Sequence, residues 1–155
     1  MYAANVKFNM SANKIESITQ NIEFTFDVYQ NLWNTIRFVE LKSKQSMQLK
    51  DSKSHQHWNG QHTLLMKYVD FLSPYIQLKK SELELLQYKQ TYDEICVMMS
   101  KTHKKAMYEN QIKEFEKKYE LAYDKWYKNY NGLTQKRIKN CIATFEKLNT
   151  TLSRK

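Results

Sequence analysis

The sequence predicts an all-α fold of three long helices in an antiparallel coiled coil or helical bundle. The chain has 155 residues but only two glycines and one proline, which disfavours strands joined by tight turns. Aromatic residues make up 14% of it, enough to build a core rather than a disordered tail. Its last third carries an apolar stripe with steps of three or four residues, the period of an α-helix. At this length we expect one domain, residues 1–155.

A first helix is expected over residues 13–49, after an irregular lead over residues 1–12. Asn13 and Glu16 have the spacing of a capping box, which favours a helix start there. Apolar residues then recur at helical spacing from Ile15 to Val39. Four more apolar residues widen this face: Phe24, Val28, Leu32 and Phe38. A face this wide indicates a helix covered on more than one side.

Residues 50–61 are expected to connect the first two helices. This stretch contains five residues that favour turns: Asp51, Ser52, Ser54, Asn59 and Gly60. Three histidines lie in or beside it: His55, His57 and His62. A zinc site needs three or four convergent ligands, and apart from Asp51 no carboxylate or cysteine lies close in the sequence. We therefore interpret the histidines as part of a solvated polar loop and expect no metal.

A second helix is expected over residues 62–100, with a kink near Pro74. Proline removes one backbone hydrogen bond and crowds the preceding turn. Two interpretations are open: either Ser73 caps a new helix that begins at Pro74, or one helix bends there. The apolar stripe passes through this point without a polar gap, which favours the bend. The polar, lysine-rich stretch from Ser100 to Lys105 then suggests a second connection.

The third and longest helix is expected over residues 104–152 as one uninterrupted rod of roughly 70 Å. Arg137 is the only charged member of its stripe. Such a stripe is too long for two shorter helices to cover, so we expect a homodimer or another helical protein as partner. The residues expected in the core or dimer seam are Ile112, Phe115, Tyr119, Trp126, Tyr130, Leu133, Phe145 and Leu148.

The formal charge of +9 favours a polyanionic partner. Lysine outnumbers arginine by twenty-two to three, and base readout and bidentate phosphate binding favour arginine. A diffuse lysine surface suits anionic lipid headgroups or sequence-independent phosphate contact, and an ordinary solvated surface is the simpler alternative. The candidate anion- or lipid-binding residues are Lys101, Lys104, Lys105, Lys117, Lys118, Lys136, Arg137 and Lys139.

No pattern of residues favours an enzyme. The sequence has no glycine-rich phosphate loop and no nucleophile beside a base, and its carboxylates lie among lysines at helical pairing distance. We expect no catalytic residues and no cofactor. The longest apolar run, Ile95 to Met99, is far too short to span a membrane, and the start lacks the pattern of a signal peptide. With Cys96 and Cys141 read as reduced thiols, we expect an intracellular protein, cytoplasmic or peripheral to a membrane.

Features between Leu64 and Leu152 follow one another in a definite order. A short motif leads into a long amphipathic helix, a lysine-rich tip follows, and an acidic pair opens an aromatic stripe. The residues concerned are Leu72, Tyr75, Ile76 and Leu78, then Leu86, Tyr92 and Lys101, then Glu114, Phe115 and Glu116, and then Trp126, Leu133, Ile138 and Phe145. This order resembles the BAR-domain superfamily, specifically the helical region of sorting nexins.

The resemblance implies a kinked three-helix coiled coil that dimerises into a crescent. Basic residues of such a crescent bind curved, anionic membranes, and Lys101, Lys104 and Lys105 would lie near a tip. The sequence thus predicts a non-enzymatic helical scaffold that self-associates and contacts an anionic membrane surface. The alternatives are a basic helical protein that binds or coats nucleic acid, and a structural subunit of a larger assembly.

Overall fold

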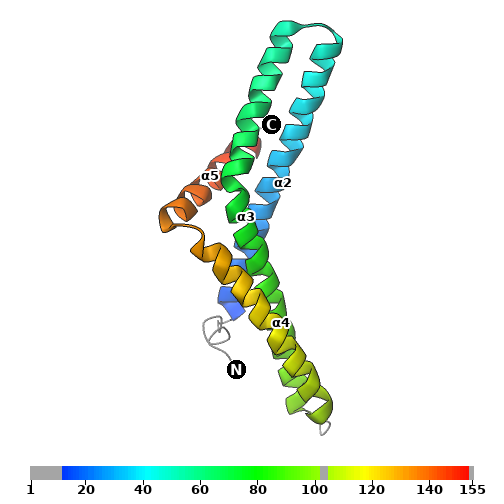
Figure 1. Cartoon of the computed structure of the whole chain (residues 1–155), viewed down its shortest axis with the longest axis vertical. Helices are drawn as coiled ribbons and strands as arrows, with labels where there is room; N and C mark the ends of the chain where they lie inside the picture. The colour runs from blue at the N-terminus through cyan, green and yellow to red at the C-terminus, as the bar shows by residue number, and fades with distance from the viewer. Residues whose placement is uncertain (1–11, 102–104, 154–155) are drawn as a thin grey trace. The chain divides into compact units, whose positions relative to one another are not determined.

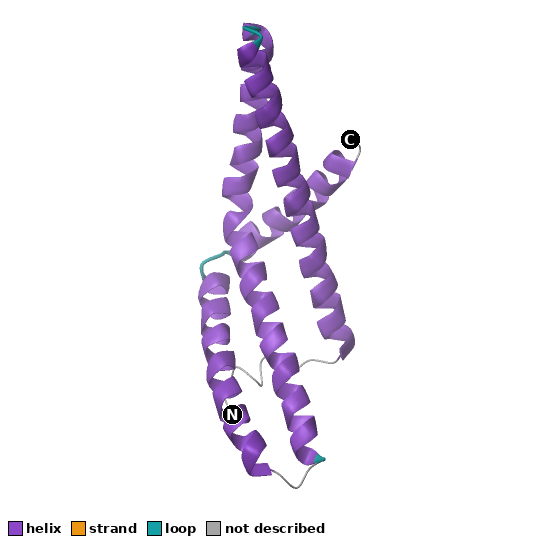
Figure 2. Ribbon diagram, turned by 90° about the vertical axis from the view of Figure 1, so that its right-hand side faces the viewer, coloured by secondary structure: helices purple, strands orange, loops and turns teal. Residues whose placement is uncertain are grey.

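The computed structural model describes residues 12–101 and 105–153, and these form four α-helices (Figure 1). The helices are α2 (Ala12–Gln48), α3 (Ser52–Ser100), α4 (Lys105–Asn131) and α5 (Gln135–Ser153). No strand occurs in the described part of the chain (Figure 2). The prediction of an all-α fold is therefore confirmed, whereas the predicted number of helices, three, is one too few.

Except at the start of the second helix and at a break within the third, the predicted helix bounds lie within one residue of the observed ones. Helix α2 begins and ends one residue earlier than the predicted range 13–49. Helix α3 ends at the predicted residue 100, and α4 begins one residue after the predicted residue 104. Helix α5 ends one residue after the predicted 152. Residues 1–11 of the expected irregular lead and residues 102–104 lie outside the described part of the chain.

The predicted connection over residues 50–61 is wrong, because the observed turn is only Leu49–Asp51. Lys50 reverses the chain with a left-handed φ of 57°. Asp51 then caps α3: its Oδ1 accepts a hydrogen bond from the Ser54 amide at 3.2 Å, and its Oδ2 accepts one from the Ser54 hydroxyl at 2.9 Å. These bonds hold the pKa of the Asp51 carboxyl below its usual range. Most of the turn-favouring residues thus lie inside α3, where contacts with α2 outweigh their low helix propensity.

The predicted uninterrupted third helix is also wrong, because it divides into α4 and α5 at residues 132–134. The Leu133 amide bonds back to the Tyr130 carbonyl at 3.1 Å, a tightened turn that ends α4. The Thr134 hydroxyl then accepts a hydrogen bond from the Arg137 amide at 3.1 Å and caps α5. The apolar spacing continues in step across this break, so periodicity alone does not reveal it. Because residues 104–152 do not form one long helix, the length of that helix no longer supports the predicted homodimer.

Pro74 lies inside α3, which continues through it as one helix. This agrees with the favoured interpretation of a single helix and excludes a new helix beginning at Pro74. The bend at Pro74 stays a prediction.

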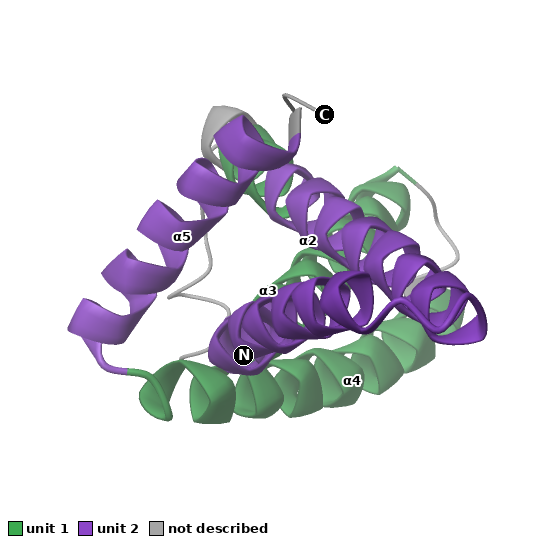
Figure 3. Ribbon diagram, turned by 90° about the horizontal axis from the view of Figure 1, so that it is seen from above, with its two compact units in different colours: residues 1–22, 77–133 green, residues 23–76, 134–155 purple. Residues whose placement is uncertain are grey.

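The described residues pack as two compact units (Figure 3). Unit 1 is residues 1–22 and 77–133, and unit 2 is residues 23–76 and 134–155. Unit 1 therefore combines the start of α2, the second half of α3, and α4. Unit 2 combines most of α2, the first half of α3, and α5. That the whole chain is one domain stays a prediction.

Within unit 2, α2 and α3 form an antiparallel hairpin. Phe38 meets Trp58 edge to face at 6.1 Å between ring centroids, and Glu40 accepts a hydrogen bond from His62 at 3.1 Å. Partner numbers on α3 fall as those on α2 rise, from Glu40–His62 to Ser43–His55, whose side chains lie 3.4 Å apart, and this is the signature of antiparallel packing. Of the four residues predicted to widen the face of α2, Val28 and Leu32 are fully buried, while Phe24 and Phe38 are exposed.

Helix α5 closes the core of unit 2 against α3. Phe145 is buried and packs on the buried ring of Tyr75 at 5.7 Å between centroids. The Cys141 sulfur, also buried, lies 4.0 Å from the Phe71 carbonyl oxygen. Burial raises the pKa of the Cys141 thiol, although the nearby Arg137 opposes this rise. Cys141 therefore serves as a small apolar core residue.

Replacing Phe145 with alanine should lower the free energy of unfolding by about 3–5 kcal/mol, because it leaves a cavity between α3 and α5. Phe38→Ala is the matched control: its side chain is exposed, and it should lose only the contact with Trp58, about 0.5–1.5 kcal/mol. Urea denaturation of both variants provides the measurement. Equal losses would contradict the assignment of Phe145 to the core.

Candidate anion-binding surfaces

The residues predicted for the core or seam are all wholly or partly buried. Four are buried, namely Tyr119, Leu133, Phe145 and Leu148, and four are half-buried, namely Ile112, Phe115, Trp126 and Tyr130. They divide between the units, because residues up to Leu133 belong to unit 1 and the last two belong to unit 2. They therefore form two packing surfaces rather than one seam.

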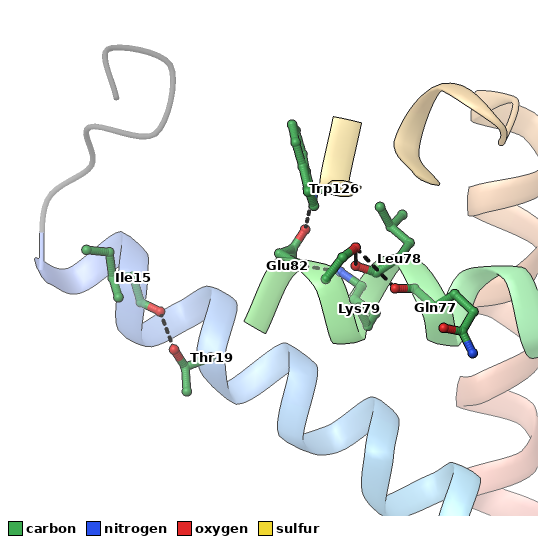
Figure 4. A network of polar contacts seen from close by, with 8 residues as sticks. Ile15, Thr19, Gln77, Leu78, Lys79, Glu82 and Trp126 are labelled. Carbon is green, nitrogen blue, oxygen red and sulfur yellow. Dashed lines mark hydrogen bonds and ion pairs between the residues drawn. The ribbon is translucent and has the colours of Figure 1, made fainter. Parts of the chain in front are cut away.

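In unit 1, α3 and α4 run antiparallel and share a polar network. The Trp126 indole nitrogen and the Glu82 carboxylate point toward one another at 3.4 Å (Figure 4). The same carboxylate lies 3.3 Å from the Lys79 ammonium nitrogen. Asn129 donates to the buried Ser81 hydroxyl at 3.1 Å, and that hydroxyl donates to the Leu78 carbonyl at 2.8 Å. These bonds fix the register of α4 on α3.

Two tyrosines of unit 1 have raised pKa values. Burial raises the pKa of Tyr119, with the Asp93 carboxylate adding to the effect. Burial, followed by Cys96 and Glu116, raises the pKa of Tyr92 to about 12. Both phenols therefore stay protonated near neutral pH, and the Tyr92 hydroxyl donates a hydrogen bond to the Glu116 carboxylate at 3.5 Å.

The candidate lysines of unit 1 are exposed where the structure describes them. Lys118 pairs with Glu114 at 3.5 Å and lies over the Phe115 ring, 5.3 Å from its centroid. Lys117 and Lys101 are exposed, and neither has a carboxylate partner among the described residues. Lys104 lies outside the described residues, and of Lys105 only the backbone, at the start of α4, is described. The predicted 101–105 cluster is thus only partly located.

The other three candidates lie at the start of α5, in unit 2. Lys136, Arg137 and Lys139 are all exposed. The Arg137 guanidinium lies over the Phe71 ring, 5.7 Å from its centroid, a cation–π contact that holds this charge against α3. Neither Lys136 nor Lys139 has an ion-pair partner in the described part of the chain.

Unit 2 carries most of the uncompensated positive charge. Its sequence contains twelve basic and six acidic residues, whereas that of unit 1 contains thirteen and ten. Every described lysine–carboxylate ion pair lies in unit 1: Lys79–Glu82, Lys89–Asp93, Lys118–Glu114 and Lys125–Glu84. In unit 2 the described pair is His62–Glu40. The positive charge of unit 2 is therefore available to an external anion.

A further basic surface was not among the predicted site residues. It is the hairpin tip, residues 38–58, where α2 turns into α3. Its lysines are Lys42, Lys44, Lys50 and Lys53. The lysines were visible in the sequence, but the contacts between the two helices at the tip were not, because residues 50–61 were predicted to be a connection rather than the start of a helix.

An open groove of about 310 Å³ lies in unit 2, lined by Leu64, Lys67, Tyr68, Phe71 and Thr144. This lining is mostly apolar and contains no carboxylate, histidine or cysteine. Among the described residues, no group of three or more histidine, cysteine, aspartate or glutamate side chains is placed to hold a metal ion.

No family model matches the chain, and neither a curated protein nor a solved structure is significantly similar to it. Within the described part of the chain, no helix has an apolar stretch sufficient to cross a bilayer.

Replacing Ser81 with alanine should destabilise the protein by about 1–2 kcal/mol, because the Asn129 amide loses an acceptor at a buried position. Thr91→Ala is the control, since its hydroxyl makes only a local bond to the Gln87 carbonyl on an exposed surface. It should change stability by less than about 0.5 kcal/mol. Thermal unfolding measures both, and an unchanged midpoint for the Ser81 variant would contradict a structural role for the network.

Proposed function

We propose that this chain is a non-enzymatic helical interaction protein that binds anionic membrane surfaces inside the cell, with unit 2 as the contacting unit. The protein lies on the surface of the bilayer rather than across it. Phosphate and carboxylate groups of lipid headgroups are its ligands.

The observation that carries this proposal is the uncompensated charge of unit 2. Residues 134–155 alone contain six basic residues and one acidic residue, so they hold +5 of the formal +9. A lysine already paired with a carboxylate gains little from a second anion, whereas an unpaired exposed lysine contributes about 1 kcal/mol near an anionic membrane. The exposed lysines of α5 are of the second kind.

The position of these charges on α5 favours a binding role over a stabilising one. A helix N-terminus carries the positive end of the macrodipole, so basic residues in the first turn destabilise a helix and acidic residues stabilise it. Lys136 and Arg137 occupy that turn, and it contains no acidic residue. A positively charged start to α5 therefore opposes helix stability but strengthens the attraction for an anion.

Lipid is favoured over nucleic acid by the kind of basic residue present. Specific readout of bases and bidentate phosphate contacts use arginine, and this chain contains three arginines against twenty-two lysines. The aromatic side chains of α4 that could stack on bases instead stack on one another, as Trp126 does on Tyr130 at 5.3 Å between centroids.

The resemblance to the BAR superfamily supports the same function, with one departure. The antiparallel pairing of α3 and α4 in unit 1 matches the pairing of the second and third helices that the resemblance implies. The division of the predicted third helix at Gly132 to Thr134 does not match the single third helix that the resemblance implies. The proposal therefore adopts the membrane contact from that family and leaves aside its crescent shape.

Self-association is the second part of the proposal. It is supported by apolar side chains that unit 1 leaves about half exposed close to the end of α3, namely Val97 and Met98. A second copy of the chain that covered them would remove this apolar surface from water.

The double variant Lys136→Gln/Lys139→Gln should weaken binding to phosphatidylserine-containing vesicles by about tenfold to thirtyfold, from the loss of two lysine contacts. It should not lower the free energy of unfolding, because the first turn of α5 loses an unfavourable charge. Co-sedimentation and urea denaturation measure the two effects. The control is Lys80→Gln/Lys128→Gln, which removes the same charge from exposed positions of unit 1.

Equal losses in the two double variants would show that only net charge matters and would contradict the role of α5. Gel shift of duplex DNA and RNA at physiological salt tests the alternative. Retention of nucleic acid without vesicle binding would replace the membrane proposal with a nucleic-acid-binding function.

Light scattering tests self-association. At tens of micromolar we expect a mass of twice 18.8 kDa, because the exposed apolar surface of unit 1 favours association. Only an 18.8 kDa species at that concentration would contradict this part of the proposal and leave the membrane contact unaffected.

A further inference from the structure

The hairpin tip combines exposed apolar side chains with unpaired lysines, and we propose that it inserts into the interface of an anionic bilayer. This inference rests on the proposed function, because it adds an apolar anchor to a membrane contact made first by charge. It concerns unit 2 alone and residues that are not among the eight candidate anion- or lipid-binding residues predicted from the sequence.

Four large apolar side chains of the tip are unusually exposed. Leu49 is 80% exposed, Met47 63%, Leu41 53% and Phe38 52%. Scattered exposed apolar residues are normal on a protein surface, but four lie within twelve residues at this end of the hairpin, and Met47 and Leu49 lie at or beside the chain reversal itself. Leu49 lies in the turn itself, and the left-handed conformation of Lys50 makes that turn tight.

The polar neighbours of this patch fit an anionic partner. Lys44, Lys50 and Lys53 are exposed and have no ion-pair partner among the described residues. The two acidic residues of the tip both have local roles: Glu40 pairs with His62, and Asp51 caps α3. The tip therefore presents an excess of positive charge around its apolar centre.

This combination is the one expected of a segment that lies in a membrane interface. Aliphatic side chains enter the boundary between headgroups and acyl chains, while lysines extend their charges back to the lipid phosphates. Lys42 places its ammonium nitrogen 5.5 Å from the centroid of the Phe38 ring, so a positive charge lies directly beside this apolar side chain. The half-buried Trp58 packs on the same ring, and tryptophan is enriched at membrane interfaces.

The tip is held in shape without any membrane. The imidazole of His55 lies 3.2 Å from the Ser43 carbonyl oxygen, and Phe38 meets Trp58 across the two helices. Insertion would therefore not require the tip to fold on binding, so little of the binding free energy is spent on ordering it.

The test compares Met47→Gln/Leu49→Gln with the control Met107→Gln/Leu121→Gln. The control exchanges the same two residue types at exposed positions on α4 in unit 1, where Leu121 is 70% and Met107 53% exposed. Full-length variants are co-sedimented with phosphatidylserine-containing vesicles at raised salt, which screens the lysines and leaves the apolar contribution. Circular dichroism and the unfolding midpoint establish that each variant folds.

We expect the tip variant to bind about tenfold or more weakly, because two apolar side chains no longer leave water, and the control to bind like the unchanged chain. Equal binding by the tip variant and the unchanged chain would overturn the inference and leave the charge-based proposal intact. No vesicle binding by the unchanged chain would overturn both. A lower mass of the tip variant in light scattering, with vesicle binding retained, would assign the patch to a second copy and also overturn it.

Discussion

The structure depends on the burial of α3, which supplies core residues to both units. In unit 2 its buried side chains include Leu72, Tyr75 and Ile76, and in unit 1 they include Leu78 and Leu85. Tyr75 and Ile76 are adjacent in the sequence and both buried, and adjacent side chains project in different directions from a helix, so α3 is buried on more than one side. A helix buried in this way is stabilised by its neighbours rather than by its own sequence, which explains how it contains a proline and begins with a polar turn.

Ion pairing divides the basic residues into two classes. In unit 1, carboxylates on α3 and α4 neutralise nearby lysines, as Glu84 does for Lys125 across the two helices at 3.6 Å. In unit 2, the acidic residues near the tip serve a cap and a histidine contact instead, so the lysines there keep their full charge. Most of the net positive charge of the chain thus belongs to unit 2. A surface with an excess of positive charge attracts anions over about a Debye length.

The sequence predicted the all-α fold and most helix ends, because amphipathic spacing and weak helix formers mark these features directly. It failed at residues 50–61, since Trp58 and His62 stabilise that part of α3 through contacts with α2 that lie far away in sequence. It failed again at Gly132 to Thr134, where a cap breaks the helix without changing the spacing of the stripe. Gly132 and Thr134 were the available signals, and the continuity of the stripe outweighed them.

The candidate surface was predictable only where exposure follows from charge. Lysines such as Lys117 and Lys136 lie at the surface as expected, because burying an unpaired charge is costly. The exposure of Leu49 could not be predicted in this way, since periodicity counts every leucine as a core residue. What makes Leu49 unusual is that the chain reverses beside it, so no neighbouring helix covers it. An apolar residue at such a reversal, surrounded by unpaired lysines, gains more from a lipid interface than either kind of side chain would gain alone.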